Sequence, residues 1–459
     1  MSKKAPAPGF GGAPSVAVQV ISGSPDGSFD ERSVVSSIVE HEHGQQPLTA
    51  RYLMALFAAQ FSLYIALVSP GVLSLPLRVE QLDPAGKASA LSLAIGIPAV
   101  LALVVSPIVG VLSDRTMSRF GRRRPWIFVG VLLGLVGMTL IGFAPAVEIV
   151  ILGWAIAFLG YSACAAMILA HFGDRLPEQQ RGRVMGINGA LTQIAPIAGI
   201  LISGGLAMSP SALFLVPAAI AGLGILIFLA VMKDPQLVDE PPALSGRELL
   251  KGYWFNPRQF PNLAWVCLSK AFVFFNFALA IYAVYLLTGR LGLSAAEVAS
   301  IVSLTSLAAV VTAIAGALGS GYLSDRIGTR KPFLVVSALI MASGSMAIAT
   351  TDSITQFIVG TLIGSFGIGI YGAVDQALIL DVLPEGGAEN GRYLAITGLA
   401  NQIPQAIGPL AAGAVVGLAS GNYAIAYIVA GASAALGALA IIPVKTGRRA
   451  KSADRPSEL

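Results

Sequence analysis

Long apolar stretches, separated by short polar segments, follow one another along most of the chain. A helix needs about 20 mostly apolar residues to cross a bilayer, and twelve stretches satisfy this requirement. The pattern predicts an all-α membrane protein with twelve transmembrane helices. The predicted spans are 52–75, 88–112, 125–144, 147–172, 184–206, 211–232, 263–287, 295–319, 332–350, 354–381, 393–418 and 422–443.

These spans contain many Gly and Pro residues, which would weaken helices in a soluble protein. In a membrane, Gly allows neighbouring helices to approach closely, and other helices satisfy the backbone groups that Pro frees. Gly360 and Gly364, four residues apart, predict one such contact face. The Gly and Pro content therefore agrees with a membrane helix bundle.

Basic residues are distributed unequally between the connecting loops. The loops after spans 2, 4, 8 and 10 hold twelve Lys and Arg residues, whereas those on the opposite side hold three. Because Lys and Arg are enriched in cytoplasmic loops, we expect a multi-pass protein of the inner or plasma membrane with both termini in the cytoplasm. The expected regions are a disordered tail at 1–49, a six-helix bundle at 50–232, a cytoplasmic linker at 233–262, a second six-helix bundle at 263–444 and a basic tail at 445–459.

The composition agrees with a lipid environment and argues against several other classes of protein. The chain is 55% hydrophobic and 12% charged, whereas soluble domains carry about 25% charged residues. The net charge of +5 arises from basic residues in short loops, so it indicates orientation and not a nucleic-acid site. Cys164 and Cys267 lie in opposite halves, and no Cys/His cluster, nucleotide-binding loop or hydrolase motif occurs. We therefore expect no metal, no cofactor and no enzymatic activity.

One loop motif occurs twice in the chain. The segment Gly-Val-Leu-Ser-Asp-Arg at 110–115 recurs as Gly-Tyr-Leu-Ser-Asp-Arg at 321–326, 211 positions later. The first copy continues to Gly-Arg-Arg-Arg-Pro at 121–125, and the second to Arg-Lys-Pro at 330–332. Such a repeat indicates two structurally equivalent halves.

A second pair of segments supports the duplication. Asp-Arg-Leu-Pro-Glu at 174–178 matches Asp-Val-Leu-Pro-Glu at 381–385. Parallel repeats of this kind place a substrate cavity between the halves near the membrane midplane. Three further residues match at an offset of 209 positions, namely Gly189, Gln193 and Gly199 with Gly398, Gln402 and Gly408.

These motifs resemble the major facilitator superfamily, and the resemblance covers the chain from about residue 51 to 444. The extended first copy at 113–126 resembles more particularly the cation-coupled glycoside transporters and the sucrose transporters of that superfamily. The resemblance implies a monomeric secondary transporter. Its two bundles would expose a small-molecule site to one side of the membrane at a time.

Asp114 and the basic residues after it are expected where span 2 meets the cytoplasm. Arginines there can pair with the carboxylate or with the partly negative C-terminal ends of helices. Such contacts would form a gate; alternatively, the basic residues are only orientation anchors. Arg78 and Glu80, beyond span 1, are candidates for an external gate. The candidate gating residues are Asp114, Arg115, Arg119, Arg122, Arg123, Asp325, Arg326, Arg330 and Lys331.

Ionisable residues within membrane spans are costly, so each is a candidate functional group. Lys270 lies about 10 Å into span 7, and Asp375 lies about 9 Å from the cytoplasmic end of span 10, taking 1.5 Å of rise per residue. We expect the two residues to pair, either as a proton-responsive or substrate-responsive switch or as a static neutral pair. The other coupling candidates are His171, Asp174 and its counterpart Asp381.

Solute recognition requires hydrogen-bonding groups that face the cavity. Amides bond sugar hydroxyls and aromatic rings cover sugar faces, although an amide within a bundle equally often joins two helices. Gln60 and Tyr64 share one helix face because they are four residues apart. The candidate binding residues are Gln60, Tyr64, Asn188, Gln193, Asn276, Gln376, Asn401 and Gln402.

The coupling ion and the solute are separate questions. Sodium-coupled glycoside transporters carry carboxylates within span 2, whereas 88–112 contains no charged residue. We therefore expect proton rather than sodium coupling, and the same departure weakens the assignment to sugars. Two other interpretations stay open, namely an exporter of drugs or metabolites with the same fold and a membrane enzyme or receptor.

Overall fold

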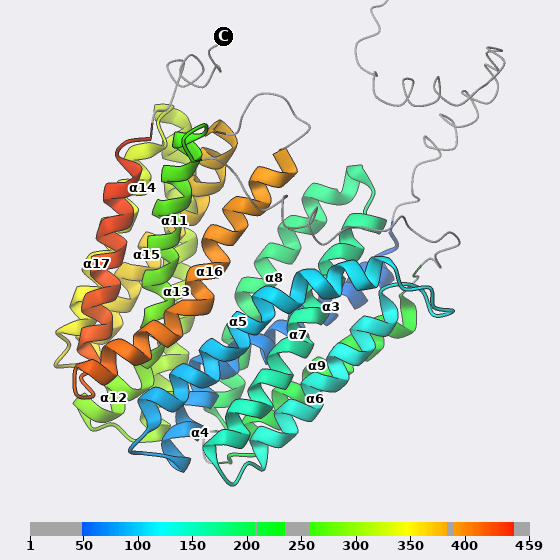
Figure 1. Ribbon diagram of the computed structural model, residues 1–459, viewed down its shortest axis with the longest axis horizontal. Coiled ribbons are helices and arrows are strands. Elements are labelled where there is room, and N and C mark those ends of the chain that lie inside the picture. The colour runs from blue at the N-terminus through cyan, green and yellow to red at the C-terminus, as the bar shows by residue number, and fades with distance from the viewer. Residues whose placement is uncertain (1–47, 207–208, 233, 235–256, 383–389, 445–459) are drawn as a thin grey trace, which may run out of the picture.

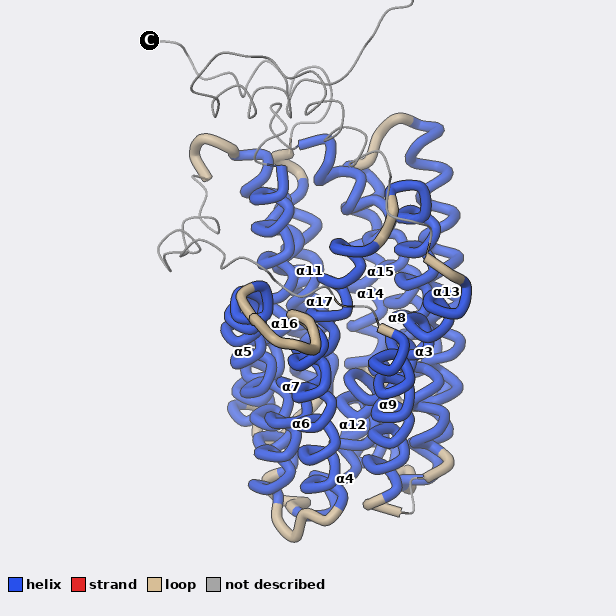
Figure 2. Tube along the Cα trace, turned by 90° about the vertical axis from the view of Figure 1, so that its right-hand side faces the viewer, coloured by secondary structure: helices blue, strands red, loops and turns tan. Residues whose placement is uncertain are grey.

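A computed structural model gives the arrangement of the chain (Figure 1). It describes residues 48–206, 209–232, 234, 257–382 and 390–444, except for the side chains of a few helical residues that include Asp174 and Asp381. The described residues form helices and no strand, as Figure 2 shows from the side. The tails predicted at 1–49 and 445–459, and most of the linker predicted at 233–262, lie outside the described residues.

Six membrane-length helical segments make up the N-terminal half. Its first segment is continuous but changes from α-helix to π-helix and back. The elements are α3 (Ala50–Ser69), the π-helix η1 (Pro70–Ser74), α4 (Leu75–Leu82), α5 (Lys87–Asp114), α6 (Arg124–Gly142), α7 (Val147–Arg175), α8 (Glu178–Gly204) and α9 (Ala212–Val231).

The C-terminal half repeats this plan. Its elements are α11 (Pro261–Leu279), the 3₁₀-helix η2 (Ala280–Tyr282), α12 (Ala283–Leu291), α13 (Ala295–Ile327), α14 (Lys331–Ala349), α15 (Ile354–Val382), α16 (Asn390–Leu418) and α17 (Ala424–Ile441). In the described part of the chain, eleven helical segments are long and apolar enough to cross a membrane. The 29-residue α16 takes the place of the twelfth. The predicted all-α architecture of two six-helix bundles is confirmed.

Local sequence signals explain where several helices begin and end. Pro125 and Pro332 stand in the first turns of α6 and α14, where a missing N–H is not needed by the helix. Ser294 and Glu297 form a capping box at the start of α13. Gly328 ends α13 with a φ of 69°, a left-handed conformation that favours Gly. These signals set the frame in which the functional groups lie.

Two features of the helices differ from the sequence-based expectation. The helices run past the predicted boundaries, so that Asp114 is the last residue of α5 and Asp325 lies in the last turn of α13 rather than in loops. The discontinuities at Pro70–Ser74 and Ala280–Tyr282 were not expected. Their first residues are 210 positions apart, so the break itself belongs to the repeat.

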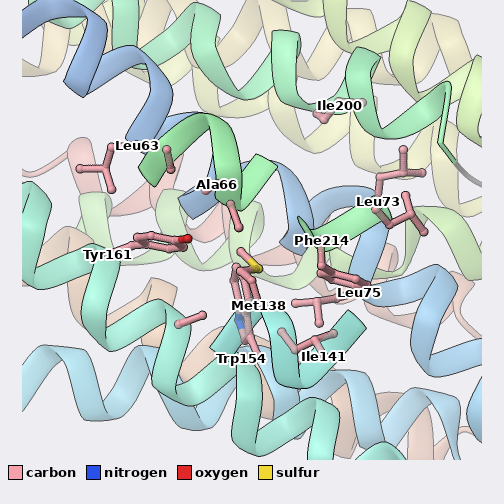
Figure 3. Close-up of a cluster of buried hydrophobic side chains, with 14 of the residues drawn as sticks. Leu63, Ala66, Leu73, Leu75, Met138, Ile141, Trp154, Tyr161, Ile200 and Phe214 are labelled. Atoms are coloured by element: carbon pink, nitrogen blue, oxygen red, sulfur yellow. The ribbon is translucent and has the colours of Figure 1, made fainter. Parts of the chain in front are cut away.

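The largest apolar cluster packs the interior of the N-terminal half and extends into the C-terminal half at Tyr282, Leu287 and Val302, while a second cluster lies within the C-terminal half. Figure 3 shows the apolar cluster of the N-terminal half, in which Leu63, Trp154 and Phe214 come from different helices. Glycines allow close approach, since a Cβ on Gly134 would lie 2.1 Å from the ring of Tyr161. A Cβ on Gly344 would lie 2.6 Å from the backbone nitrogen of Gly364 and 2.8 Å from the Gly360 oxygen, which places the predicted small-residue face against α14.

Candidate functional site between the two halves

The two halves contact each other at one end of the bundle. We call the end where Asp114 and Asp325 lie the motif end, and the opposite end the closed end. Among the described residues, five hydrogen bonds cross between the halves at the closed end, and four of them have a backbone oxygen as the acceptor. These four join Ser92 Oγ to Pro409 O at 2.8 Å, Tyr282 Oη to Ala88 O at 2.9 Å, Tyr285 Oη to Pro76 O at 3.1 Å and Ser303 Oγ to Ile200 O at 3.3 Å.

Charged and aromatic side chains reinforce this contact. Glu80 and Lys87 form an ion pair within the N-terminal half. Thr288 of the other half donates a hydrogen bond to Glu80 Oε1 at 3.1 Å, and Lys87 Nζ lies 4.9 Å from the ring centroid of Tyr285. We call Glu80, Lys87, Tyr282, Tyr285 and Thr288 the closed-end cluster. It contains Glu80 of the expected external gate.

Arg78, the other candidate for that gate, does not reach across the halves in its described contacts. Its guanidinium donates to Ala144 O at 2.7 Å and to Gln81 Oε1 at 3.4 Å. Both acceptors belong to the N-terminal half. Arg78 therefore ties the end of α4 to the turn after α6, where it stiffens one side of the contact.

The halves separate toward the motif end. Figure 1 shows that α17 of the C-terminal half and α6 of the N-terminal half lie farther apart at this end than at the other. Space is open beside the interior glycines there, because a Cβ added at Gly186, Gly189 or Gly372 would meet no atom within 4 Å. At the closed end, by contrast, a Cβ on Gly96 would lie 2.4 Å from the Leu410 side chain. The described conformation is closed at one end and open at the other.

The first motif segment contacts helix ends of its own half. Arg123 pairs with Asp114 at 3.1 Å, although the Asp114 side chain is 55% exposed. Asp234 Oδ2, just after α9, accepts the backbone N–H groups of Arg123 at 2.6 Å and Arg124 at 2.8 Å. Arg124 also donates to Leu229 O near the end of α9. Arg115, Arg119 and Arg122 lie in the same segment, with Arg119 over the ring of Phe120.

The second motif segment is anchored in a similar way. Arg330 donates to Ala377 O on α15, and Lys331 donates to Ile442 O and Val444 O after α17. Asp325 and Arg326 are exposed in the last turn of α13. These contacts, like those of the first segment, join helices within a half and satisfy partly negative helix C-termini. They are the kinds of contact that the gate interpretation describes, and both the gate role and the anchor role stay predictions.

The two intramembrane charges meet within the C-terminal half. Lys270 on α11 and Asp375 on α15 are joined by an ion pair, with Nζ 2.7 Å from Oδ2. Their side chains are 5% and 4% exposed. The next residue, Gln376, and Gly372 one turn earlier are exposed. The ion pair is therefore buried, but exposed residues of α15 lie next to it in the sequence.

The N-terminal half has an amide pair where the other half has charges. Gln60, which is 210 positions before Lys270, donates through Nε2 to Asn188 Oδ1 at 2.9 Å. Both amides are buried, and the contact joins α3 to α8. The structure thus brings together two predicted binding residues, but in a helix-to-helix contact.

The remaining binding candidates divide into two groups. Asn276 donates to Ser345 Oγ at 2.8 Å and so joins α11 to α14. Tyr64 is half-buried, whereas Gln193 and Gln376 are exposed. Asn401 accepts a hydrogen bond from Gln405, and Gln402 beside it is exposed.

The amides of α16 and its exposed isoleucines lie on different faces of the helix. Asn401 and Gln405 lie one turn apart, on the helix face opposite Ile403 and Ile407, which are 42% and 45% exposed. Helix α16 packs against α5 and α11 on its other sides. Since α5 belongs to the other half, Asn401, Gln402 and Gln405 lie on a helix that borders the contact between the halves.

The coupling candidates on α7 have different surroundings. His171 is buried and hydrogen-bonds through Nε2 to Tyr52 Oη. Phe228 packs edge-on against both rings. The sequence did not single out Tyr52, because one Tyr at a helix start carries no signal. The side chains of Asp174 and Asp381 lie outside the described residues.

Two proteins with related sequences match parts of this chain. A "Multidrug efflux pump Tap" of Mycolicibacterium fortuitum is 29% identical over 147 residues, 31% of this chain and 36% of that protein. A sucrose transport protein of Oryza sativa is 49% identical over 45 residues, 10% of this chain and 8% of that protein. The chain thus matches only about a third or less of the length of these two relatives.

Solved structures share the fold over nearly the whole chain. A bacterial homologue of the human lysosomal transporter Spinster, in an inward-facing and occupied conformation, superposes with a TM-score of 0.67 at 16% identity, covering 94% of this chain and 100% of that one. A D-xylose–proton symporter superposes with a TM-score of 0.61 at 16% identity, covering 86% and 97%. The sequence model of the Major Facilitator Superfamily matches residues 52–319 and 266–458. The chain therefore belongs to the Major Facilitator Superfamily, a family of transporters and not of enzymes.

Proposed function

We propose that this transporter moves a neutral, hydroxyl-rich solute of the sugar class together with a proton. The observation that carries the coupling is the buried Lys270–Asp375 ion pair. The carboxylate and the ammonium group together have no net charge, which lowers the cost of burying them in a low-dielectric interior. Adding one proton to the carboxylate changes the net charge of the pair to +1, which alters the electrostatic balance of the whole half.

The sugar class is supported by the amide groups of α16, which packs against α5 of the other half. Asn401, Gln402 and Gln405 offer amide donors and acceptors and no charge, which suits hydroxyl groups. A sucrose transporter among the sequence relatives and a xylose–proton symporter among the structures agree with this assignment. The solute would bind between α16 and the opposite half, near the Asp375 side of α15.

We also propose that the motif end faces the cytoplasm, because the Lys and Arg residues are concentrated there. The described conformation is then inward-facing, with the closed-end cluster shutting the outer side. The proposed assembly is a monomer in a cell membrane, with both termini in the cytoplasm. Labelling of single cysteines introduced at Arg119 and Gly289 in whole cells tests this orientation, since only the second should react with an impermeant reagent.

An exporter of drugs or metabolites is the second candidate. The match to an efflux pump supports it, as does the absence of an ion pair from the described interior of α3, α5 and α8. Such an exporter would recognise apolar or aromatic compounds rather than hydroxyl groups. Its transport would oppose the direction of proton flow.

Reconstitution into liposomes separates the two candidates. Ligand-induced thermal stabilisation across sugars and drugs first selects the probe, because binding to the native state raises apparent stability. We expect the selected sugar to accumulate under an inward proton gradient, and the Asp375→Asn variant to lose this accumulation. Proton-driven sugar accumulation that persists in this variant would remove Asp375 from coupling. Extrusion of a dye without sugar movement would favour the exporter.

A further inference from the structure

Two buried oxygen atoms beside the Lys270–Asp375 pair have unused hydrogen-bonding capacity. Lys270 Nζ binds Asp375 Oδ2, which leaves Oδ1 without a hydrogen-bond partner in the described structure. The hydroxyl of Tyr371 is likewise buried and lacks a partner there. Leaving such atoms unpaired inside a protein is costly, so two of them in neighbouring positions require a physical explanation.

The position of Tyr371 brings its hydroxyl to the side of Asp375. Both residues belong to α15 and are four positions apart, so they share one helix face. The Tyr371 side chain is 1% exposed, and Phe274 packs edge-on against its ring with the centroids 6.4 Å apart. The ring is thus held in place by packing, with its hydroxyl close enough to interact with the Asp375 carboxyl. A small shift of either side chain would complete a hydrogen bond between the two unpartnered oxygens.

The repeat supplies a matched position without a charge. Tyr161 on α7 is 210 positions before Tyr371, and it is also fully buried with an unpartnered hydroxyl. The residue equivalent to Lys270 is Gln60. A Tyr at this position is therefore compatible with a role in packing alone, and the neighbouring carboxylate is what distinguishes Tyr371.

We propose that Oδ1 of Asp375 is the atom that takes up the coupling proton, with the Tyr371 hydroxyl as the positioning group that hydrogen-bonds to it. This inference rests on the proposed function and deepens it. A proton from water forms an O–H bond at Oδ1, because Oδ2 is occupied by the ammonium group. Lys270 keeps its charge, the pair changes from neutral to a net charge of +1, and the proton returns to water when the O–H bond breaks.

The direction of the Tyr371 effect follows from hydrogen-bond strength. A phenol donates to an ionised carboxylate more strongly than it accepts from a neutral carboxylic acid. Removing the hydroxyl should therefore favour the neutral acid. Besides Tyr371, the titratable groups described near the pair are Cys267 on α11 and Tyr393 on α16, which packs in the same cluster as Cys267. Helices α14 and α17 contribute apolar side chains such as Met341 and Ala438, and α13, which packs against α15, has no titratable residue between Glu297 and Tyr322.

Infrared difference spectroscopy of the purified full chain tests this proton site without a transported solute. We expect a carboxylic-acid C=O band to appear on acidification and to be absent from Asp375→Asn. In Tyr371→Phe the midpoint of this band should move to higher pH by about one unit, the size expected for losing one hydrogen bond to a charged group. Its frequency should rise because the acid has lost a partner. Tyr161→Phe, the matched control, should change neither quantity.

Each other outcome overturns a defined part of the proposal. A Tyr371→Phe midpoint equal to that of Tyr161→Phe leaves Tyr371 a packing residue and overturns the positioning role. If Tyr371→Phe does not fold, ring-labelled tyrosine in the unmodified chain replaces it, and a phenol band that does not change at the carboxyl midpoint overturns the same role. If no band depends on Asp375, the proposed proton site is overturned. A band with these properties in a chain that shows no proton-driven transport overturns only the proposed function.

Discussion

The two halves of the molecule share one backbone plan but differ in chemistry at the same depth. Positions 210 apart are equivalent in the repeat, so Gln60 corresponds to Lys270 and Tyr161 corresponds to Tyr371. The N-terminal half fills this level with an amide pair, and the C-terminal half fills it with an ion pair. The duplication therefore preserved the frame, while in the described part of the chain only the C-terminal half places an ion pair at this level.

This difference assigns separate tasks to the halves. A neutral amide contact between α3 and α8 holds two helices together without responding to pH. An ion pair between α11 and α15 also holds two helices together, but its strength depends on the protonation of Asp375. The four predictions below test how far this contrast extends.

The largest effect is expected when one partner of the ion pair is removed. Lys270→Ala leaves an unpaired buried carboxylate, which should lower the free energy of unfolding by about 3–5 kcal/mol. The amide counterpart Gln60→Ala should cost about 1–3 kcal/mol, because it leaves only a neutral group unpaired. Thermal or denaturant unfolding in detergent measures both variants. Equal losses would contradict the proposed contrast between the halves.

The double variant Lys270→Gln with Asp375→Asn sharpens the comparison by giving the C-terminal half an uncharged pair. It should recover most of the stability lost in Lys270→Ala, because no unpaired charge is left. Its transport should nevertheless be independent of the proton gradient. Uptake into liposomes with and without a pH gradient checks this, and restored proton dependence would place the coupling elsewhere.

The close contact of Gly134 with Tyr161 provides a third test. A Cβ at Gly134 would lie 2.1 Å from the ring, so Gly134→Ala should destabilise the N-terminal half by about 1–3 kcal/mol. Gly186→Ala, where the added Cβ meets no atom within 4 Å, is the control and should be nearly neutral. If Gly134→Ala and Gly186→Ala change the melting temperature by similar amounts, Gly134 does not pack closely against Tyr161.

The smallest effect is expected at the closed-end cluster. Glu80→Gln weakens its ion pair with Lys87, a partly exposed contact worth about 1 kcal/mol or less. It should raise the labelling rate of a cysteine introduced at Ser92 by about two- to fivefold, as the outer side opens more often. Asp352→Asn breaks the exposed Arg290–Asp352 pair, which lies within one half, and should not change this rate. An equal rise in both variants would indicate general loosening.

The sequence was sufficient for the features that depend on long segments. Twelve apolar stretches, the duplicated motif and the depth of Lys270 and Asp375 follow from spacing alone, and the structure contains the corresponding helices and the ion pair. The amide pair of Gln60 and Asn188 was not predictable as a pair, because which helices of a bundle touch is decided by packing. The same applies to Asn276, whose partner Ser345 lies on a different helix.

Contacts made by single residues outside any motif could not be predicted from the sequence. Asp234 appeared only as part of a linker, yet its carboxylate holds the start of α6. Tyr282, Tyr285 and Thr288 carry no recognisable motif, and their role depends on the two halves meeting. The interest of Tyr371 depends on its unpartnered hydroxyl and on that of the equivalent Tyr161, and neither feature can be recognised without the structure.

The π-helical turn at Pro70–Ser74 has a consequence for the angular setting of everything after it. A π turn contains one residue more than the corresponding α turn, and one residue corresponds to about 100° of rotation about the helix axis. Glu80 reaches Lys87 and Thr288 with this rotation in place. Converting Pro70–Ser74 to an α-helical turn with all its residues kept would rotate Glu80 toward a different neighbour, whereas deleting one residue from this turn would restore an ordinary helix and leave Glu80 in place. The π turn therefore fixes the direction in which Glu80 points at the outer contact.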